Sequence, residues 1–203
     1  MLDTSEHALQ QIIDQSNRRI SVPDLQMLGR VCDAVGAATI LEIGSADGGS
    51  SVVLGSKAQE RGGRLYCIEP QPKQRMVDNM IEHGLRDSYT LIAAASPWLG
   101  EKEKLVPAEI DLLFIDGRHD VRWALIDYHY FSPRVRTGGA IVFHDTGGTC
   151  QEDRVQPDYG TPDYVPLVQR AIDIIRTTDT DLTELDRSDA RVGGAIAFRK
   201  GGL

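Results

Sequence analysis

The sequence has little cysteine and no long apolar run. Only three of its 203 residues are cysteine, at positions 32, 67 and 150, and they form no CxxC pair. An odd number of widely spaced thiols is typical of a reducing compartment, so we expect a cytoplasmic protein. The opening residues MLDTSEHALQ lack the apolar core of a signal peptide, and no uncharged apolar run approaches the roughly 18 residues of a membrane span. We therefore expect no membrane partner.

Positive charge is also scarce. The formal net charge is −8, and basic residues such as Arg134 and Arg136 are dispersed along the chain. Such a surface repels phosphate backbones, which argues against a nucleic-acid partner. The apolar content of 41% is enough for a sizeable core. Because chains split into domains mainly above roughly 250–300 residues, we expect one domain. The sequence leaves a homo-oligomer open.

Apolar patterns alternate between strand and helix periods. The pattern predicts helices over residues 4–18, 23–35, 49–62, 72–85 and 119–135, and strands over residues 38–44, 64–70, 89–95, 110–117 and 138–145. Repeated alternation of this kind predicts an α/β protein with an open, doubly wound parallel sheet. Residues 146–164 hold glycines and prolines without periodicity, which is typical of a lid or binding loop.

The last part of the chain predicts one more helix, at 165–176, followed by a hairpin of residues 182–188 and 193–200. The expected organisation is a single domain over 1–203: N-terminal helices (1–36), a cofactor-binding half (37–145), a lid loop (146–164), and a last crossover helix with the terminal hairpin (165–203).

The most informative stretch is TILEIGSADGGSS, residues 39–51, a glycine-rich loop after the first strand. It lacks the lysine of a phosphate-binding P-loop and the middle glycine of GxGxxG. Two acids, Glu42 and Asp47, oppose a pyrophosphate but suit the cationic end of S-adenosylmethionine. Glu69, which ends the second strand, is able to accept hydrogen bonds from ribose hydroxyls of S-adenosylmethionine or of NAD, so it does not discriminate between them.

With these residues in view, the chain resembles the class I S-adenosylmethionine-dependent methyltransferases over about residues 36–200. The segments LEIGSADGGSS, YCIEP, DLLFIDGRHD and GGAIVFHDT carry the resemblance in order. It implies a mostly parallel, seven-stranded Rossmann-like sheet with an antiparallel last strand. It also implies a set of cofactor-binding residues: Glu42, Gly44, Ser45, Gly48, Ser50, Glu69, Ala94 and Asp116.

Within that class, FIDGRHD and FHDT are similar to a smaller group of metal-dependent O-methyltransferases that act on sugars of macrolides and other glycosides. Some relatives in this group are named cephalosporin hydroxylases, and one bacterial enzyme methylates mannosides. The resemblance implies methyl transfer to a hydroxyl of a sugar, glycoside or polysaccharide precursor. A catechol-like acceptor needs the same machinery and stays open.

Two carboxylates, Asp116 and Asp145, end the fourth and fifth strands, which should be neighbours. Two carboxylates at the ends of neighbouring strands repel each other unless they share a cation or a proton. We therefore expect Asp116 and Asp145 to bind Mg²⁺ or Mn²⁺. Relatives often carry two adjacent acids where this chain has His144 and Asp145. His144 is therefore either a third metal ligand or the general base, and the catalytic set is Asp116, His144 and Asp145.

Other residues near this edge have two readings each. His119 is an alternative base, or it caps its helix or orients Asp116. Trp98, Tyr159 and Tyr164 suit a sugar or aromatic acceptor, or they pack a lid. Two rival functions also remain: an NAD-dependent oxidoreductase, which the missing GxGxxG disfavours, and a non-catalytic binding protein, which the Asp116–His144–Asp145 set disfavours.

Overall fold

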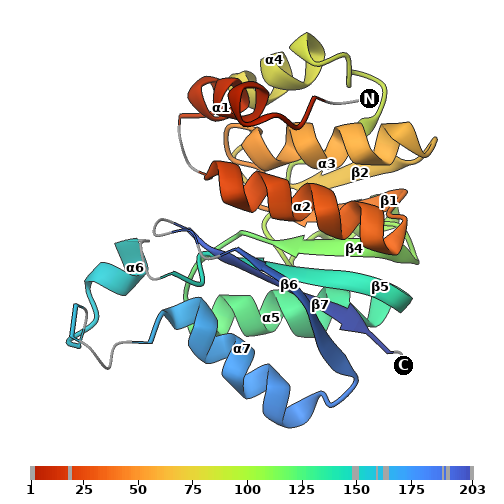
Figure 1. Cartoon of the computed structure of the whole chain (residues 1–203). Helices are drawn as coiled ribbons and strands as arrows, with labels where there is room; N and C mark the ends of the chain where they lie inside the picture. Colours follow the sequence, from red (N-terminus) through yellow and green to blue (C-terminus); the bar gives the residue numbers. More distant parts are fainter. Residues whose placement is uncertain are drawn as a thin grey trace.

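The computed structural model describes residues 3–17, 20–147, 151–158, 160–161, 165–188, 190 and 193–201 (Figure 1). Its centre is a seven-stranded sheet in the order β3-β2-β1-β4-β5-β7-β6. Strands β1 to β5 run parallel, whereas β7 pairs antiparallel with both β5 and β6. The predicted doubly wound sheet with a reversed last strand is confirmed.

The strands and helices follow the predicted alternation. The strands are β1 (Thr39–Ile43), β2 (Arg64–Ile68), β3 (Tyr89–Ile92), β4 (Ile110–Ile115), β5 (Val135–His144), β6 (Leu182–Ser188) and β7 (Ala195–Lys200). The helices are α1 (Glu6–Gln15), α2 (Val22–Val35), α3 (Gly49–Glu60), α4 (Gln74–Glu82), α5 (Val121–Phe131), α6 (Gln151–Arg154) and α7 (Leu167–Thr178), with 3₁₀ turns η1 (Gly100–Leu105) and η2 (Ser132–Arg134).

Two apolar layers cover the two faces of the sheet. Successive side chains of a strand point to opposite faces, so Ile40 packs under α2 and α3 whereas Leu41 packs on the other side. The second layer includes Tyr128 of α5 and Ile172 of α7. Figure 1 shows α2 and α3 above the sheet and α5 and α7 below it.

Several boundaries differ from the prediction for identifiable reasons. Helix α5 ends at Phe131 because Pro133 follows within two residues and the chain turns into η2. Strand β5 begins at Val135 rather than 138, since Val135 pairs with Ile110 across an irregular register. Between β3 and β4, where no element was predicted, the chain forms the 3₁₀ turn η1.

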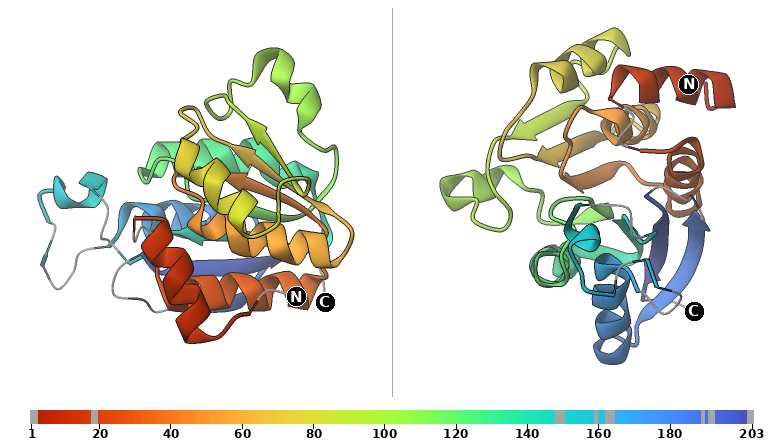
Figure 2. Two further views of the ribbon diagram at one scale, coloured as in Figure 1. Left: turned by 90° about the horizontal axis from the view of Figure 1, so that it is seen from above. Right: turned by 90° about the vertical axis from the view of Figure 1, so that its left-hand side faces the viewer.

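Helix α2 begins with a capping box, in which Ser21 and Asp24 exchange hydrogen bonds between side chain and backbone. The helix then packs against α3 and the β6 strand. After β5, the segment that contains α6 projects from one edge of the molecule (Figures 1 and 2). Within the described part of the chain, no helix is both long and apolar enough to span a membrane.

Candidate active site

The glycine-rich loop between β1 and α3 passes very close to the end of β4. Gly44 has a φ of +87°, and a Cβ atom on it would lie 2.1 Å from the backbone oxygen of Asp116. Gly48 has a φ of +90° and forms the N-cap of α3. Gly44 therefore requires glycine for both conformation and space, and it sets the β1 loop against the β4 loop, whereas Gly48 favours glycine for its conformation and packs against Met76 of α4.

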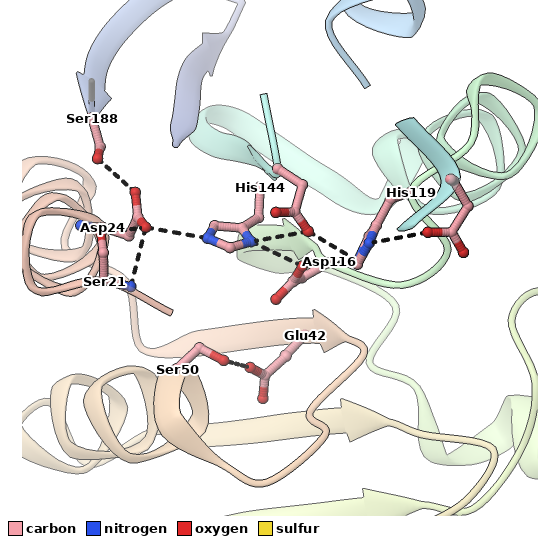
Figure 3. A network of polar contacts seen from close by, with 10 residues as sticks. Ser21, Asp24, Glu42, Ser50, Asp116, His119, His144 and Ser188 are labelled. Carbon is pink, nitrogen blue, oxygen red and sulfur yellow. Dashed lines mark hydrogen bonds and ion pairs between the residues drawn. The ribbon is translucent and has the colours of Figure 1, made fainter. Parts of the chain in front are cut away.

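Glu42 is fully buried beneath this loop. Its carboxylate accepts a hydrogen bond of 2.5 Å from the Ser50 hydroxyl (Figure 3). It also accepts from the Ser51 hydroxyl at 2.6 Å and from the Cys67 thiol at 3.2 Å. Burial raises the pKa of Glu42 to about 7, against the opposing effect of the serine hydroxyls. Glu42 thus ties β1 to the first turn of α3, and direct cofactor contact by Glu42 or Ser50 stays a prediction.

The second acid of the loop is also neutralised within the protein. Asp47 is buried and forms an ion pair with Lys73, with 3.0 Å between Nζ and Oδ2. Asn79 donates a hydrogen bond to the Asp47 backbone oxygen. The two acids therefore oppose a pyrophosphate less strongly than the sequence indicated. What distinguishes this loop from a dinucleotide-binding loop is the missing middle glycine of GxGxxG.

Glu69 lies just beyond β2 and reaches the same loop. One carboxylate oxygen accepts from the backbone N–H of Ala46 at 3.1 Å, and the other accepts from Gln71 at 2.9 Å. Each oxygen keeps further acceptor capacity for a ligand hydroxyl. Nearby, the Ser45 hydroxyl is buried and has no hydrogen-bond partner among the described residues. Such an unpaired buried group calls for a ligand or water.

The ends of β4 and β5 bring three metal-binding side chains together. Phe114 and Val142 point to the face covered by α2 and α3, so Asp116 and His144, two residues later, point the same way. Asp116, His144 and Asp145 each offer one ligand atom, and these atoms lie within 4.8 Å of one another. The predicted convergence at this edge is present, and the ligand role itself stays a prediction.

The charge of histidine side chains balances these acids. His144 Nδ1 lies 3.1 Å from Asp116 Oδ1 and 3.6 Å from Asp145 Oδ2. Burial alone would lower the pKa of His144, but the carboxylates of Asp116, Asp145 and Asp24 raise it well above its usual value. Burial alone would raise the pKa of Asp116, yet His144 and His119 bring it down to about 2. The site is therefore built to hold positive charge.

Asp145 has a backbone conformation that few non-glycine residues adopt. Its φ is +56°, in the left-handed region. Hydrogen bonds hold the turn that follows, because Thr146 and Gly147 donate their N–H groups to Gly194 and Gly193. Strained residues of this kind concentrate at functional sites. Here the turn directs the Asp145 carboxylate back toward His119 and His144.

His119 occupies a different position from the one its sequence suggested. It does not cap α5, because Asp120 is the N-cap and accepts from the Trp123 N–H. Its Nε2 lies 3.1 Å from Asp145 Oδ2 and 3.4 Å from Asp116 Oδ1. The His119 side chain is 27% exposed, whereas that of His144 is 1% exposed. His119 is thus the histidine of the site that an incoming molecule is able to reach.

The sequence did not predict a site role for Asp24, whose carboxylate contacts the Nε2 side of the His144 ring. Its side chain is fully buried, and Oδ2 lies 3.3 Å from His144 Nε2. In the sequence, Asp24 follows Ser21 at the spacing of an ordinary capping box. Only the packing of α2 over the end of β5 reveals the second contact.

The loop after β3 contacts α5. Ala94 is half-buried, and Ser96 donates a hydrogen bond of 2.5 Å to Asp127 of α5, whose burial raises its pKa to about 6. Trp98 is 65% exposed and packs edge-on against Trp123. Tyr159 and Tyr164, the other predicted aromatic contacts, lie outside the described residues.

Comparison with known proteins agrees with this geometry. A family model described as a methyltransferase domain matches residues 41–146, just over half of the chain. The matched span runs from β1 to the turn after β5 and contains every predicted cofactor and metal residue. The chain belongs to this methyltransferase family. No curated protein matches it in sequence.

Solved structures share the fold at low sequence identity. An O-methyltransferase from Bacillus cereus in complex with SAH is 21% identical, with a TM-score of 0.71 over 98% of this chain and 91% of that chain. The O-methyltransferase TomG from Streptomyces achromogenes, involved in tomaymycin synthesis and solved with SAM, is 18% identical, with a TM-score of 0.68 over 95% and 89%. A candidate caffeoyl-CoA O-methyltransferase from Staphylococcus aureus is 17% identical, with a TM-score of 0.66 over 96% and 92%.

Proposed function

We propose that this protein is an S-adenosylmethionine-dependent O-methyltransferase assisted by a divalent metal ion. The observation that carries the proposal is the convergence of Asp116, His144 and Asp145 beside the glycine-rich loop of a methyltransferase domain. Similar folds have been solved with SAM or SAH, which supports the cofactor class. Family membership favours methyl transfer over the oxidoreductase alternative.

The cofactor side of the proposal rests on the β1 and β2 loops. Glu69 has spare acceptor capacity for ribose hydroxyls, and the unpaired Ser45 hydroxyl lies in the same loop. Gly44 and Gly48 let the loop pass close to the end of β4 and to Met76 of α4, which sets its path. The half-buried Ala94 is the proposed adenine contact. Glu42 and Ser50 hold the β1–α3 loop from its buried side.

The donor set suits a divalent ion. Two carboxylates and one imidazole are near enough for a shared ion, and the imidazole tilts the choice from Mg²⁺ toward Mn²⁺ or a later transition metal. When bound, the ion would act as a Lewis acid that stabilises the alkoxide of the acceptor. Metal ligands must be deprotonated, so binding through His144 would release its Nδ1 proton.

Methyl transfer forms an oxygen–carbon bond and breaks the sulfur–carbon bond of the cofactor, while the acceptor hydroxyl gives up a proton. His119 is the residue we assign as the base, because its side chain is partly exposed and lies beside both acids. The two acids orient its ring, and the fixed sheet edge aligns the acceptor with the cofactor, which is the main entropic task of the protein.

For the acceptor, we propose a small molecule or oligosaccharide that carries a hydroxyl beside a second oxygen. The sequence resemblance favours a sugar or glycoside. A structural neighbour named for caffeoyl-CoA favours a catechol-like acceptor, as do the exposed Trp98 of the loop after β3 and its partner Trp123. Both acceptors present two adjacent oxygens to one ion.

The test is a methyl-transfer assay with S-adenosylmethionine, Mn²⁺ and a panel of methyl glycosides and catechols. Release of S-adenosylhomocysteine and a mass increase of one methyl group on the acceptor are the expected results, both lost in Asp145→Ala. Binding of S-adenosylmethionine without transfer to either class would argue for a binding protein. Failure to bind it at all would refute the proposal.

A further inference from the structure

One buried carboxylate beside the candidate metal site comes from a helix and not from the end of a strand. Asp24 belongs to the first turn of α2, which lies 120 residues before His144 in the chain. Its side chain is 0% exposed, and that of His144 is 1% exposed. A buried acid against a buried imidazole is costly unless the geometry is specific, so their contact needs an explanation.

The surroundings of Asp24 hold it in one orientation. Its Oδ1 accepts a hydrogen bond of 2.5 Å from the Ser188 hydroxyl at the end of β6, and its Oδ2 accepts one of 2.6 Å from Ser21 (Figure 3). Gly193 covers the Asp24–His144 contact, because a Cβ atom there would lie 2.8 Å from His144 Nε2 and 3.0 Å from Asp24 Oδ2. Three separate segments of the chain therefore enclose this one contact.

The two ring nitrogens of His144 consequently face different partners. Nε2 lies 3.3 Å from Asp24 Oδ2, whereas Nδ1 faces Asp116 and Asp145, at 3.1 and 3.6 Å. In metal sites, a ligating histidine usually donates its other N–H to a carboxylate, which fixes the tautomer and raises the basicity of the ligating nitrogen. The arrangement Asp24–His144–metal has this order.

We infer that Asp24 is a positioning residue that holds the proton on His144 Nε2 and presents the Nδ1 lone pair to a metal ion shared with Asp116 and Asp145. The inference rests on the proposed metal site and adds to it a residue from the N-terminal helices. Metal affinity thereby depends on α2 staying packed over the end of β5. The Ser188 bond also links this residue to the terminal hairpin.

The test compares Mn²⁺ affinity, measured by calorimetry and by electron paramagnetic resonance, in the wild type and three variants. Asp24→Asn nearly preserves shape but weakens the acceptor, and it should lower Mn²⁺ affinity by about 10- to 100-fold. His144→Ala should lower it at least as much. The matched control is Ser188→Ala, which removes a partner of Asp24 but leaves the contact with His144, and it should bind Mn²⁺ nearly as the wild type does.

The outcomes distinguish the role of Asp24 from the role of the proposed metal ligands. Normal Mn²⁺ affinity in Asp24→Asn together with weak binding in His144→Ala would overturn the role of Asp24 and keep the ligand set. Normal affinity in His144→Ala would overturn the ligand set itself. Should Asp24→Asn fail to fold, ¹⁵N NMR of His144 in the Zn²⁺-loaded wild type decides: a proton on Nε2 and none on Nδ1 is expected, and the opposite tautomer overturns the inference.

Discussion

The two halves of the candidate site treat their acids in opposite ways. On the β1–β2 side, each acid has partners within the protein: Glu42 accepts from two serines of α3, Glu69 from two backbone N–H groups, and Asp47 pairs with Lys73. On the β4–β5 side, Asp116 and Asp145 face each other and two histidines. The acids of the first half are satisfied by groups of the protein, whereas those of the second half lie together beside two imidazoles, where we propose a metal ion.

This difference predicts which ligand each half needs. A preformed loop with satisfied acids is suited to a cofactor that arrives ready to bind, since little rearrangement is required. A group of acids balanced by imidazole protons is suited to a metal ion that replaces those protons. Substitutions in the two halves should therefore separate cofactor binding from metal-dependent chemistry.

The largest effect is expected on the β4–β5 side. Asp145→Ala should abolish methyl transfer and its metal dependence, while the affinity for S-adenosylmethionine is maintained because the β1 and β2 loops hold the cofactor. Chelation of the wild type should have the same effect, and added Mn²⁺ should restore activity. Transfer rates with and without chelator, beside calorimetry with the cofactor, check this. Full activity in excess chelator would leave His119 acting without a metal.

The second effect separates the two histidines. His119→Gln should lower the turnover rate by about 10²–10⁴-fold, the usual contribution of general acid–base catalysis, with Mn²⁺ affinity nearly unchanged. His144→Ala should instead weaken Mn²⁺ binding. Steady-state kinetics and metal titration of both variants measure the distinction. Equal loss of metal binding in the two variants would mean that His119 is itself a ligand.

The third effect concerns stability against pH on the β1–β2 side. The folded-state pKa of Glu42, about 7, is above its ordinary value of 4.5 because of burial. Its contribution to stability is therefore fully present below pH 4.5 and is lost as the pH rises through 7. Glu42→Gln does not ionise, so between pH 5 and 8 the wild type should lose about 2–3 kcal/mol relative to this variant.

Urea unfolding of both proteins across this pH range measures that difference. Ser50→Ala serves as a control, because it removes a hydroxyl that stabilises the ionised Glu42 carboxylate. The protein that carries Ser50→Ala and keeps Glu42 should therefore lose stability more steeply as the pH rises. A stability difference that does not change with pH would show that Glu42 ionises normally in the folded protein.

The smallest effect is on the cofactor itself. Glu69→Ala should weaken S-adenosylmethionine binding by about 1.5–3 kcal/mol, the range for hydrogen bonds to a charged group. Mn²⁺ affinity should be unaffected, since Glu69 belongs to the other half of the site. Calorimetry with each ligand separately is the measurement. An unchanged dissociation constant for the cofactor would remove Glu69 from the ribose site.

The alternating apolar pattern predicted the doubly wound sheet, the family resemblance added its seven strands and reversed last strand, and together they predicted the meeting of Asp116, His144 and Asp145. Each lies at the carboxyl end of an apolar strand, and neighbouring parallel strands end at the same edge. Side-chain surroundings were not predictable in the same way. The burial of Glu42 under two serines and the different exposure of His119 and His144 depend on loop conformations that no local pattern specifies.

Asp24 is the clearest example of what the sequence could not reveal. Its capping box with Ser21 fully accounts for an acid at that position, so nothing in the local pattern calls for a second role. The contact with His144 arises only because α2 packs across the sheet near the end of β5, 120 residues away in the chain. Contacts of this range depend on tertiary packing.

The most direct test of the account is a crystal structure with S-adenosylhomocysteine and Mn²⁺, with anomalous scattering used to locate the ion. We predict one Mn²⁺ bound by Asp116, Asp145 and His144 Nδ1, with the ribose hydroxyls on Glu69. An ordered cofactor with no Mn²⁺ between these three side chains would contradict the metal-assisted mechanism. A cofactor bound away from the β1 and β2 loops would contradict the assignment of the site.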